Sequence, residues 1–245
     1  MLILAFPLLA LVSCAAKEND SLLARQKYRE ALKYSSVNLK DKMYANLKEA
    51  AELAPAEPSY LLTLGDSYFS DGRLEEAEKT FLQVLQLDAN SVEAHRRLGR
   101  LYMQQKKWNQ AIDNLKASLK TPGVSFPHQV HNWLAVSYYA QGDFGMAEKE
   151  WLHALRIDEN AAIRLNLALA YRDHEQFDKA LGSLEKALSA SPKLVQAHHQ
   201  IALLFLKKKD IEGARKHFQE VIDLNPQSDL AEDSRKYMEL MEPAQ

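Results

Sequence analysis

The chain has 245 residues, 47% of them hydrophobic, but only 8 glycines, 8 prolines and one cysteine. So few turn-forming residues argue against a many-stranded β-sandwich or barrel. A single cysteine excludes an internal disulfide framework and a metal site made of several thiolates. With 31 basic and 33 acidic residues the net charge is -2, so the chain as a whole has no field that would attract nucleic acid.

The N-terminal residues have the character of an export signal. Residues 1–16 (MLILAFPLLALVSCAA) carry no charge, and their apolar run, residues 1–12, is shorter than the roughly 20 residues needed to span a bilayer. This length is typical of the apolar region of a signal peptide. No Lys or Arg precedes the run, so either the start lies further upstream or the terminal amine alone supplies the usual positive charge.

The run ends in Leu-Val-Ser-Cys at residues 11–14, which resembles the lipobox of bacterial lipoproteins. The resemblance implies that residues 1–13 are removed, that Cys14 is acylated, for example by palmitate, and that residues 14–23 form a short polar tether. Two or more acyl chains hold a protein on a membrane, whereas one chain binds only marginally. Ala15 and Ala16 follow the cysteine in place of Asp, which in that family fits the periplasmic face of the outer membrane. The alternative is an ordinary signal, cleaved after Ala15 or Ala16, and a soluble periplasmic protein.

The remainder of the chain repeats at a nearly constant period. A small residue followed three positions later by an aromatic one recurs at spacings of 34, 34, 36, 33 and 34 residues: Ala31/Tyr34, Gly65/Tyr68, Gly99/Tyr102, Ala135/Tyr138, Ala168/Tyr171 and Ala202/Phe205. Twelve residues after the small position comes an alanine in five copies, and four residues later a large apolar residue: Leu47, Phe81, Leu115, Trp151, Leu184 and Phe218.

This pattern resembles the tetratricopeptide repeat, a unit of 34 residues that folds as two antiparallel helices, A and B. The resemblance implies an all-α fold, a right-handed superhelical solenoid of six repeats over residues 24–228. Small residues let helices A and B approach closely, and the aromatic residues fill the space between neighbouring helices. An open stack needs a cap over its last apolar face, and we expect a capping helix over residues 229–241 within a C-terminal segment, residues 229–245.

The one irregular junction lies at residues 121–127 (TPGVSFP), where two prolines and a glycine accompany two extra residues. Lengthening a surface loop costs little free energy, so a tolerated insertion is one interpretation. A contact loop or a hinge between repeats 1–3 and 4–6 is the other.

The A helices of such a stack line a concave surface that extended partners use. The repeat positions that face this surface are mostly apolar with one basic unit, and they define a candidate partner-binding groove: Leu62, Phe69, Arg96, Arg97, Arg100, Met103, Asn132, Val136, Tyr139, Leu165, Leu169, Arg172 and Leu203. His199 belongs to the same set of positions.

The three arginines of this groove crowd one helical turn. Like charges four residues apart on a helix repel each other, at a cost of a few tenths of a kcal/mol. Because arginine pairs bidentately with carboxylates, an arrangement with this cost indicates a candidate carboxylate clamp, formed by Arg96 and Arg100. The alternative is that Asp66 and Glu93 neutralise the arginines, and that the aliphatic residues of the groove pack on adjacent helices. A basic run at residues 207–209 is expected to be a solvated helix end.

No catalytic motif is present: we find no phosphate-binding glycine loop, no nucleophile elbow and no zinc-protease motif. We therefore expect no enzymatic activity, no cofactor, no small-molecule substrate and no metal. Among the histidines, His95, His131 and His198 each lie four residues before a small residue, which favours a packing role over a metal site. His128 with His131 is the pair that would serve a metalloprotein, the alternative of a different class.

A lipid-anchored chain of six tetratricopeptide repeats with little else resembles the pilotin family of type IV pilus systems. Those are outer-membrane lipoproteins needed for assembly and localisation of the secretin ring. The resemblance implies a non-catalytic adaptor whose partners are a secretin subunit, held in the groove, and the membrane, reached through Cys14. A scaffold lipoprotein for peptidoglycan hydrolases or for outer-membrane protein assembly is the alternative.

Overall fold

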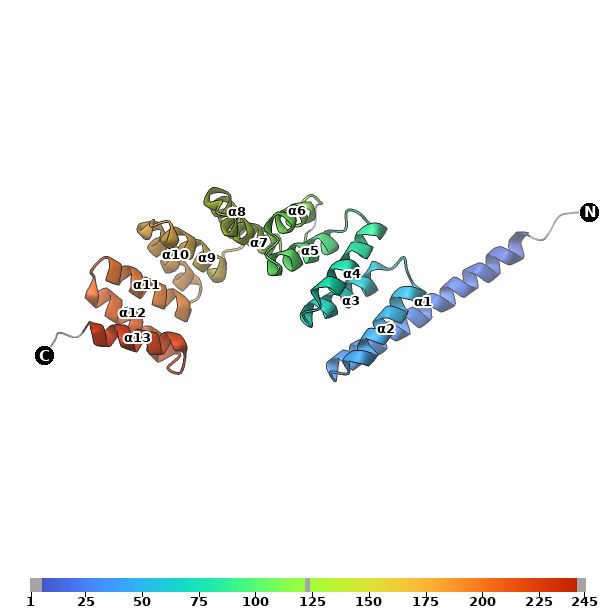
Figure 1. The fold of residues 1–245 in the computed structure, drawn as a ribbon, viewed down its shortest axis with the longest axis horizontal. Helices are drawn as coiled ribbons and strands as arrows, with labels where there is room; N and C mark the ends of the chain where they lie inside the picture. Colours follow the sequence, from blue (N-terminus) through green and yellow to red (C-terminus); the bar gives the residue numbers. More distant parts are fainter. Residues whose placement is uncertain (1–5, 122–123, 242–245) are drawn as a thin grey trace, which may run out of the picture. The chain divides into compact units, whose positions relative to one another are not determined.

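The computed structural model describes the backbone of residues 6–121 and 124–241, and side chains from residue 18 onward within those ranges. These residues form thirteen helices and contain no strand, which confirms the all-α prediction (Figure 1). Six pairs of helices, each an A helix followed by a B helix, are succeeded by one final helix. The predicted lipidation site, Cys14, has its side chain outside the described residues.

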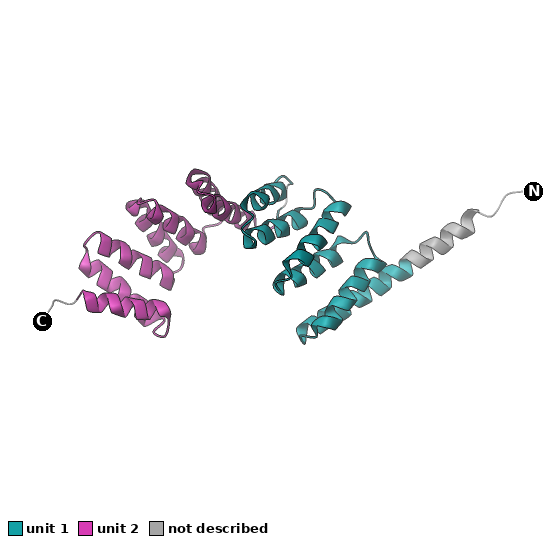
Figure 2. Cartoon of the chain, viewed as in Figure 1, with its two compact units in different colours: residues 1–124 teal, residues 125–245 magenta. Residues whose placement is uncertain are grey.

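The chain divides into two compact units between Val124 and Ser125, and each unit is described by itself (Figure 2). Unit 1 holds the first three helix pairs: α1 (Phe6–Ser36) with α2 (Lys40–Leu53), α3 (Pro58–Ser70) with α4 (Leu74–Leu87), and α5 (Val92–Gln104) with α6 (Trp108–Ser118).

Unit 2 holds the other three pairs and the cap: α7 (Pro127–Ala140) with α8 (Phe144–Ile157), α9 (Ala161–Asp173) with α10 (Phe177–Ala190), α11 (Val195–Lys207) with α12 (Ile211–Leu224), and α13 (Asp229–Leu240). The helix expected over residues 229–241 is α13, which packs on α12 and α11. Ser228 caps its N-terminus by accepting a hydrogen bond from the Ala231 N–H at 3.2 Å.

Unit 2 begins at the irregular junction. Residues 122 and 123 lie outside the described residues, and Phe126, the residue before α7, is 62% exposed with a left-handed backbone (φ 57). Pro127 then occupies the first helical position, where its missing N–H costs nothing. The two interpretations of this junction stay open.

The close approach of helices A and B explains the small residue of each repeat. A Cβ added to Gly65 would lie 2.4 Å from the ring of Phe81, and one added to Gly99 would lie 2.6 Å from the side chain of Leu115. Phe81 and Leu115 are the large apolar residues of their B helices and are buried. The glycines of α3 and α5 therefore lie where the large apolar residue of the facing B helix occupies the space that a side chain would need.

The aromatic position ties neighbouring repeats together. Tyr102 of α5 donates a hydrogen bond to Glu78 of α4 at 2.9 Å, and Tyr171 of α9 donates to Glu148 of α8 at 2.6 Å. Burial, and then the hydrogen bond to Glu78, raises the pKa of Tyr102 to about 12. Each of these rings is buried while its hydroxyl reaches the preceding B helix.

All six A-to-B turns use one residue with a left-handed backbone, which ends helix A. Two of these residues are glycines, and the other four bear a side chain: Asn38, Gly72, Lys106, Gly142, Glu175 and Lys209. The glycines marked two of the turns in the sequence. Lys106, Glu175 and Lys209 adopt the same conformation because the helices on either side impose it.

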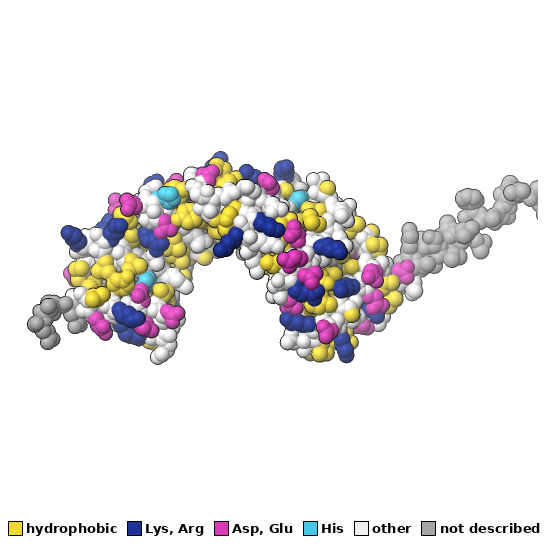
Figure 3. Space-filling model, viewed as in Figure 1, with side chains coloured by type: hydrophobic (Ala, Val, Ile, Leu, Met, Phe, Trp, Pro, Cys, Tyr) yellow, Lys and Arg dark blue, Asp and Glu magenta, His cyan; other side chains and the backbone are white. Residues whose placement is uncertain are grey.

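On the face shown in Figure 3, acidic and basic side chains are interspersed over both units, in line with the nearly balanced composition. Lys208, in the basic run at residues 207–209, lies at the end of α11 and pairs with Asp178 at 2.5 Å. Within the part of the chain that the structure describes, no helix combines the length and the apolar character needed to cross a membrane.

Candidate partner-binding site

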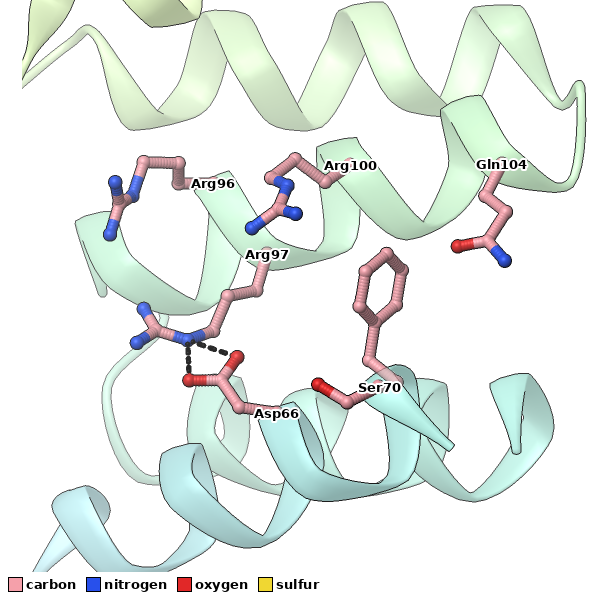
Figure 4. Close-up of a pocket in the computed structure, with 7 residues that line it drawn as sticks. Asp66, Ser70, Arg96, Arg97, Arg100 and Gln104 are labelled. Atoms are coloured by element: carbon pink, nitrogen blue, oxygen red, sulfur yellow. Dashed lines mark hydrogen bonds and ion pairs between the residues drawn. The ribbon is translucent and has the colours of Figure 1, made fainter. Parts of the chain in front are cut away.

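Helices α3 and α5 of unit 1 enclose a polar pocket of about 430 Å³. The residues that line it come from one turn after another of the two A helices: Asp66, Phe69, Ser70, Arg96, Arg97, Arg100 and Gln104. Figure 4 shows the three arginines on α5, with Arg97 reaching across to Asp66 on α3. The pocket therefore brings together four of the predicted groove residues.

Two carboxylates hold two of these arginines in place. Arg97 donates from Nε to both oxygens of Asp66, at 2.8 and 2.9 Å, and a second nitrogen of Arg97 donates to Glu93. Arg96 donates to Glu93 at 2.6 Å. Asp66 and Glu93 thus contact Arg96 and Arg97 as the alternative interpretation expected, but they supply two negative charges against three positive ones.

The protonation states in the pocket are fixed by these contacts. Burial by itself raises the pKa of Glu93, but the hydrogen bonds and charges of Arg96 and Arg97 outweigh it, so this pKa lies below its ordinary value. Burial by itself lowers the pKa of Arg97, but the charge of Asp66 outweighs it, so this pKa lies above its ordinary value. Glu93 and Arg97 are therefore both charged at neutral pH.

One donor of the arginine cluster has no acceptor among the residues that the structure describes. The Nε–H of Arg96 is buried and makes no hydrogen bond with any of them. A buried donor without a partner costs about 1–3 kcal/mol. The guanidinium of Arg100 lies over the ring of Phe69, 5.3 Å from its centre, so it is positioned at the apolar wall of the pocket. Because arginine pairs bidentately with carboxylates, the pocket is suited to an acidic side chain or a chain terminus.

The other predicted residues of unit 1 lie near the pocket without lining it. Leu62 and Met103, like Phe69, are half-buried and pack against the core formed by the helices of unit 1. Of the three remaining residues of the pocket, Asp66 was expected as a partner of the arginines, whereas Ser70 and Gln104 were absent from the prediction. Both lie five residues after the small residue of their repeat, a signal that the repeat pattern could have provided.

The candidate residues of unit 2 are engaged in contacts between its A helices. Tyr139 of α7 donates to Asp173 of α9 at 2.7 Å, and burial, with this hydrogen bond, raises its pKa to about 12. Arg172 pairs with Asp173 at 2.6 Å and also donates to Gln200 of α11. Asn132 accepts hydrogen bonds from Trp151 at 2.9 Å and from Asn166 at 3.2 Å.

These polar contacts join α7, α9 and α11 into one surface that also carries the predicted aliphatic residues. Val136, Leu165, Leu169 and Leu203 are half-buried there. Leu203 packs against the cluster formed by Ala202, Ala214 and Phe218, as the packing interpretation expected. This face therefore offers a partner partly covered aliphatic surface rather than a basic pocket.

His199 was expected on the open face, and this expectation is wrong. Its side chain is 5% exposed because α13 covers it, and its Nε2 lies 3.0 Å from Asp233 on that helix. The capping helix was predicted, but which side chains of α11 it would cover depends on its packing angle, and the repeat period does not specify that angle.

The other histidines have packing roles. His95, His131 and His198 each place Nδ1 within 3.0 Å of the residue nineteen positions later on their own B helix: Asn114, Glu150 and His217. His128 lies 3.6 Å from Asp158. Among the described residues, no group of three histidine, cysteine, aspartate or glutamate side chains is placed to hold a metal ion.

Solved structures with similar folds include a type IV pilus biogenesis factor. PilF of Pseudomonas aeruginosa superposes with a TM-score of 0.73 at 14% identity, covering 89% of this chain and 99% of that one. PilW, described as a widely conserved type IV pilus biogenesis factor, superposes with a TM-score of 0.75 at 17% identity, covering 86% and 97%. YrrB, described as a protein with an unusual peptide-binding site, superposes with a TM-score of 0.61 at 18% identity, covering 78% and 97%. At these identities the likeness is one of fold.

Among curated proteins, the chain is 20% identical over 167 residues to the Hsp70-Hsp90 organising protein of Plasmodium falciparum (isolate 3D7). The match covers 66% of this chain but only 28% of that protein's length.

Two family models match the sequence directly. A TPR repeat model matches residues 65–106, and a tetratricopeptide repeat model matches residues 96–162 and 165–229, more than half of the chain. Proteins of this type bind protein partners, and the helix pairs, the small-residue contacts and the matched models agree. The chain is a member of the tetratricopeptide repeat family.

Proposed function

We propose that the protein is a non-catalytic, lipid-anchored adaptor of the bacterial outer membrane that binds a segment of a protein partner. The partner is a secretin subunit of a type IV pilus system, and the protein acts as a pilotin in secretin assembly and localisation. A scaffold for peptidoglycan hydrolases or outer-membrane protein assembly is the alternative, and it would use the same surfaces.

The observation that carries the proposal is the arginine pocket between α3 and α5. It combines three arginine side chains with an apolar wall at Phe69. These features suit the recognition of an acidic residue in an extended segment, with the charge supplying orientation and the aromatic ring supplying apolar contact.

Support for the pilus assignment comes from the extent of the likeness to PilF and PilW. Each of these chains is covered almost entirely, at 99% and 97%, so the likeness is not limited to a few repeats. Support for the anchor comes from Cys14, the single cysteine, at the end of the apolar run. Acyl chains there would hold the adaptor at the membrane while the groove holds its partner.

The pocket is tested by replacing Arg96 and Arg100 together with alanine. Each charge-assisted hydrogen bond contributes about 1.5–3 kcal/mol, so loss of even one should weaken partner binding at least about tenfold. The measurement is the affinity of the purified protein for a secretin subunit, with circular dichroism to show that the helices are intact.

The matched control replaces Arg156 and Lys186, two exposed cations of unit 2, with alanine. It should bind the secretin subunit as the parent does. Equal affinity of parent and Arg96/Arg100 variant would remove the pocket from the proposal. Recovery of peptidoglycan enzymes and no secretin with the parent protein would contradict the pilotin assignment and favour the alternative.

A further inference from the structure

The first helix of the stack exposes a surface that its counterparts bury. The residue two positions after the small residue of helix A is fully or almost fully buried in three later repeats, with Leu101 0%, Ala170 1% and Leu204 2% exposed, whereas Ser67 of α3 is half-buried. In these repeats the preceding helix pair packs on helix A: α4 on α5, α8 on α9, and α10 on α11. In α1 the equivalent residue is Lys33, which is exposed.

This exposed side of α1 is basic. Arg25, Arg29 and Lys33 follow one another at intervals of four residues, so they form one line about 12 Å long on the helix. All three are exposed, and their side chains make no hydrogen bond or ion pair with any other residue that the structure describes. Like charges at this spacing repel one another, so the arrangement has a cost that the fold does not offset.

Two acidic residues of α1 lie near the cations. Glu18 lies on the same side as the basic residues, and Glu30 lies three residues before Lys33, roughly 60° from it around the helix, whereas Asp20 is turned from each cation by more than about 100°. Three cations therefore face two carboxylates, and the net charge of this side stays positive. Two exposed leucines flank the cations, Leu22 at 60% and Leu32 at 46% exposed. We call these five residues, Leu22, Arg25, Arg29, Leu32 and Lys33, the basic stripe.

The other end of the stack shows that exposure alone does not produce such a stripe. In α13 both basic side chains are paired within the chain: Lys236 pairs with Glu232 at 2.7 Å, and Arg235 donates to the carbonyl of Pro226 at 2.7 Å. Asp233 lies 3.0 Å from His199. The unpaired cations therefore distinguish α1 from the helix that caps the opposite end.

We propose that the basic stripe of α1 binds a membrane surface that carries anionic phospholipid. Arginine and lysine pair with lipid phosphates, and the two leucines can enter the headgroup region. Each cation near an anionic surface raises partitioning about fivefold, so three raise it about a hundredfold. The stripe begins eight residues after Cys14, so on the anchored protein that we propose it would face the same membrane and hold α1 against it. The stripe itself does not require the acyl chains.

The test uses the full chain with Cys14→Ala, which carries no acyl group, and vesicles of phosphatidylcholine with or without phosphatidylglycerol. The apolar residues 1–12 bind both kinds of vesicle, so the informative quantity is the ratio of the two partition coefficients measured by co-sedimentation. We expect strong preference for the anionic vesicles, and its loss, by about a hundredfold, in the variant Arg25→Glu, Arg29→Glu, Lys33→Glu.

The matched control is Lys149→Glu, Lys186→Glu, Lys193→Glu, which makes the same change in net charge at exposed positions of unit 2. It should keep most of the preference. Unchanged preference in the α1 variant, or equal loss in both variants, would overturn the proposal. A third result would also overturn it: the parent self-associates, the α1 variant does not, and vesicle binding persists in both. The basic stripe would then bind a second copy of the protein. Secretin binding distinguishes failure of this proposal from failure of the proposed function. If only the basic stripe proposal is wrong, the protein still binds the secretin subunit through the arginine pocket.

Discussion

The contact between Gly65 and Phe81 allows a quantitative test of the packing. In Gly65→Ala the new Cβ would meet three ring atoms of Phe81, at 2.4, 2.7 and 2.9 Å. The ring is 1% exposed, so it cannot move into solvent to relieve the contact. Overpacking of this kind costs about 1–3 kcal/mol, while alanine in place of glycine inside a helix gains about 1 kcal/mol. The net change in the free energy of unfolding should be a loss of up to about 2 kcal/mol.

The control is Gly182→Ala in α10, where nothing lies within 4 Å of the added Cβ. This variant should gain about 1 kcal/mol, so the two variants should differ by about 1–3 kcal/mol. Urea unfolding followed by circular dichroism measures both, and hydrogen exchange of α3 and α4 locates the loss in unit 1. Adding Phe81→Leu should restore part of the loss in Gly65→Ala. If Gly65→Ala is stabilised as much as Gly182→Ala, the reasoning that the close approach requires glycine is refuted.

Three further predictions concern the anchor, a turn and the pocket. Cys14→Ala should abolish incorporation of labelled palmitate into the protein, and a variant that is still acylated would contradict the anchor at Cys14. Lys106→Gly should raise the free energy of unfolding by up to about 1 kcal/mol, because glycine adopts the left-handed turn conformation (φ 57) without strain. The urea midpoint should rise accordingly, and a lower midpoint would contradict this. The depressed pKa of Glu93 implies a stabilising contribution that is present above its unfolded pKa, about 4.5, and is lost as the pH falls through its lower folded value. Glu93→Gln should therefore show less loss of stability on acidification than the parent in urea titrations at several pH values, and equal slopes would count against the ion pairs with Arg96 and Arg97.

Most of the fold could be predicted because each repeat uses the same few contacts. The spacing of small and aromatic residues indicated both helices of every repeat, and Gly65 and Gly99 lie where the helices approach most closely. The left-handed conformation in the turns was predictable only where the residue is glycine. Lys106, Glu175 and Lys209 have the same left-handed backbone, but nothing in a lysine or glutamate indicates it. That conformation results from the packing of the helices on either side.

The site was predictable in position but not in detail. Repeat positions placed Phe69, Arg96 and Arg100 on one surface, and the structure brings them into one pocket. The pairing of Arg97 with Asp66 depends on the rotation of α5 against α3 and on the choice of rotamers by a long side chain, which no spacing specifies. His199 shows the same limit, because its burial depends on how α13 lies across α11.

The most direct test of the proposed function is site-specific photo-crosslinking from the arginine pocket in living cells. A photoreactive residue at Gln104, an exposed position in the pocket lining, reports which protein occupies the pocket. The same residue at Lys186 in unit 2 serves as the control. Our account predicts a crosslink to a secretin subunit from position 104 that disappears when Arg96 and Arg100 are alanine. Crosslinks from position 104 to peptidoglycan hydrolases or outer-membrane assembly proteins, with none to secretin, would contradict it.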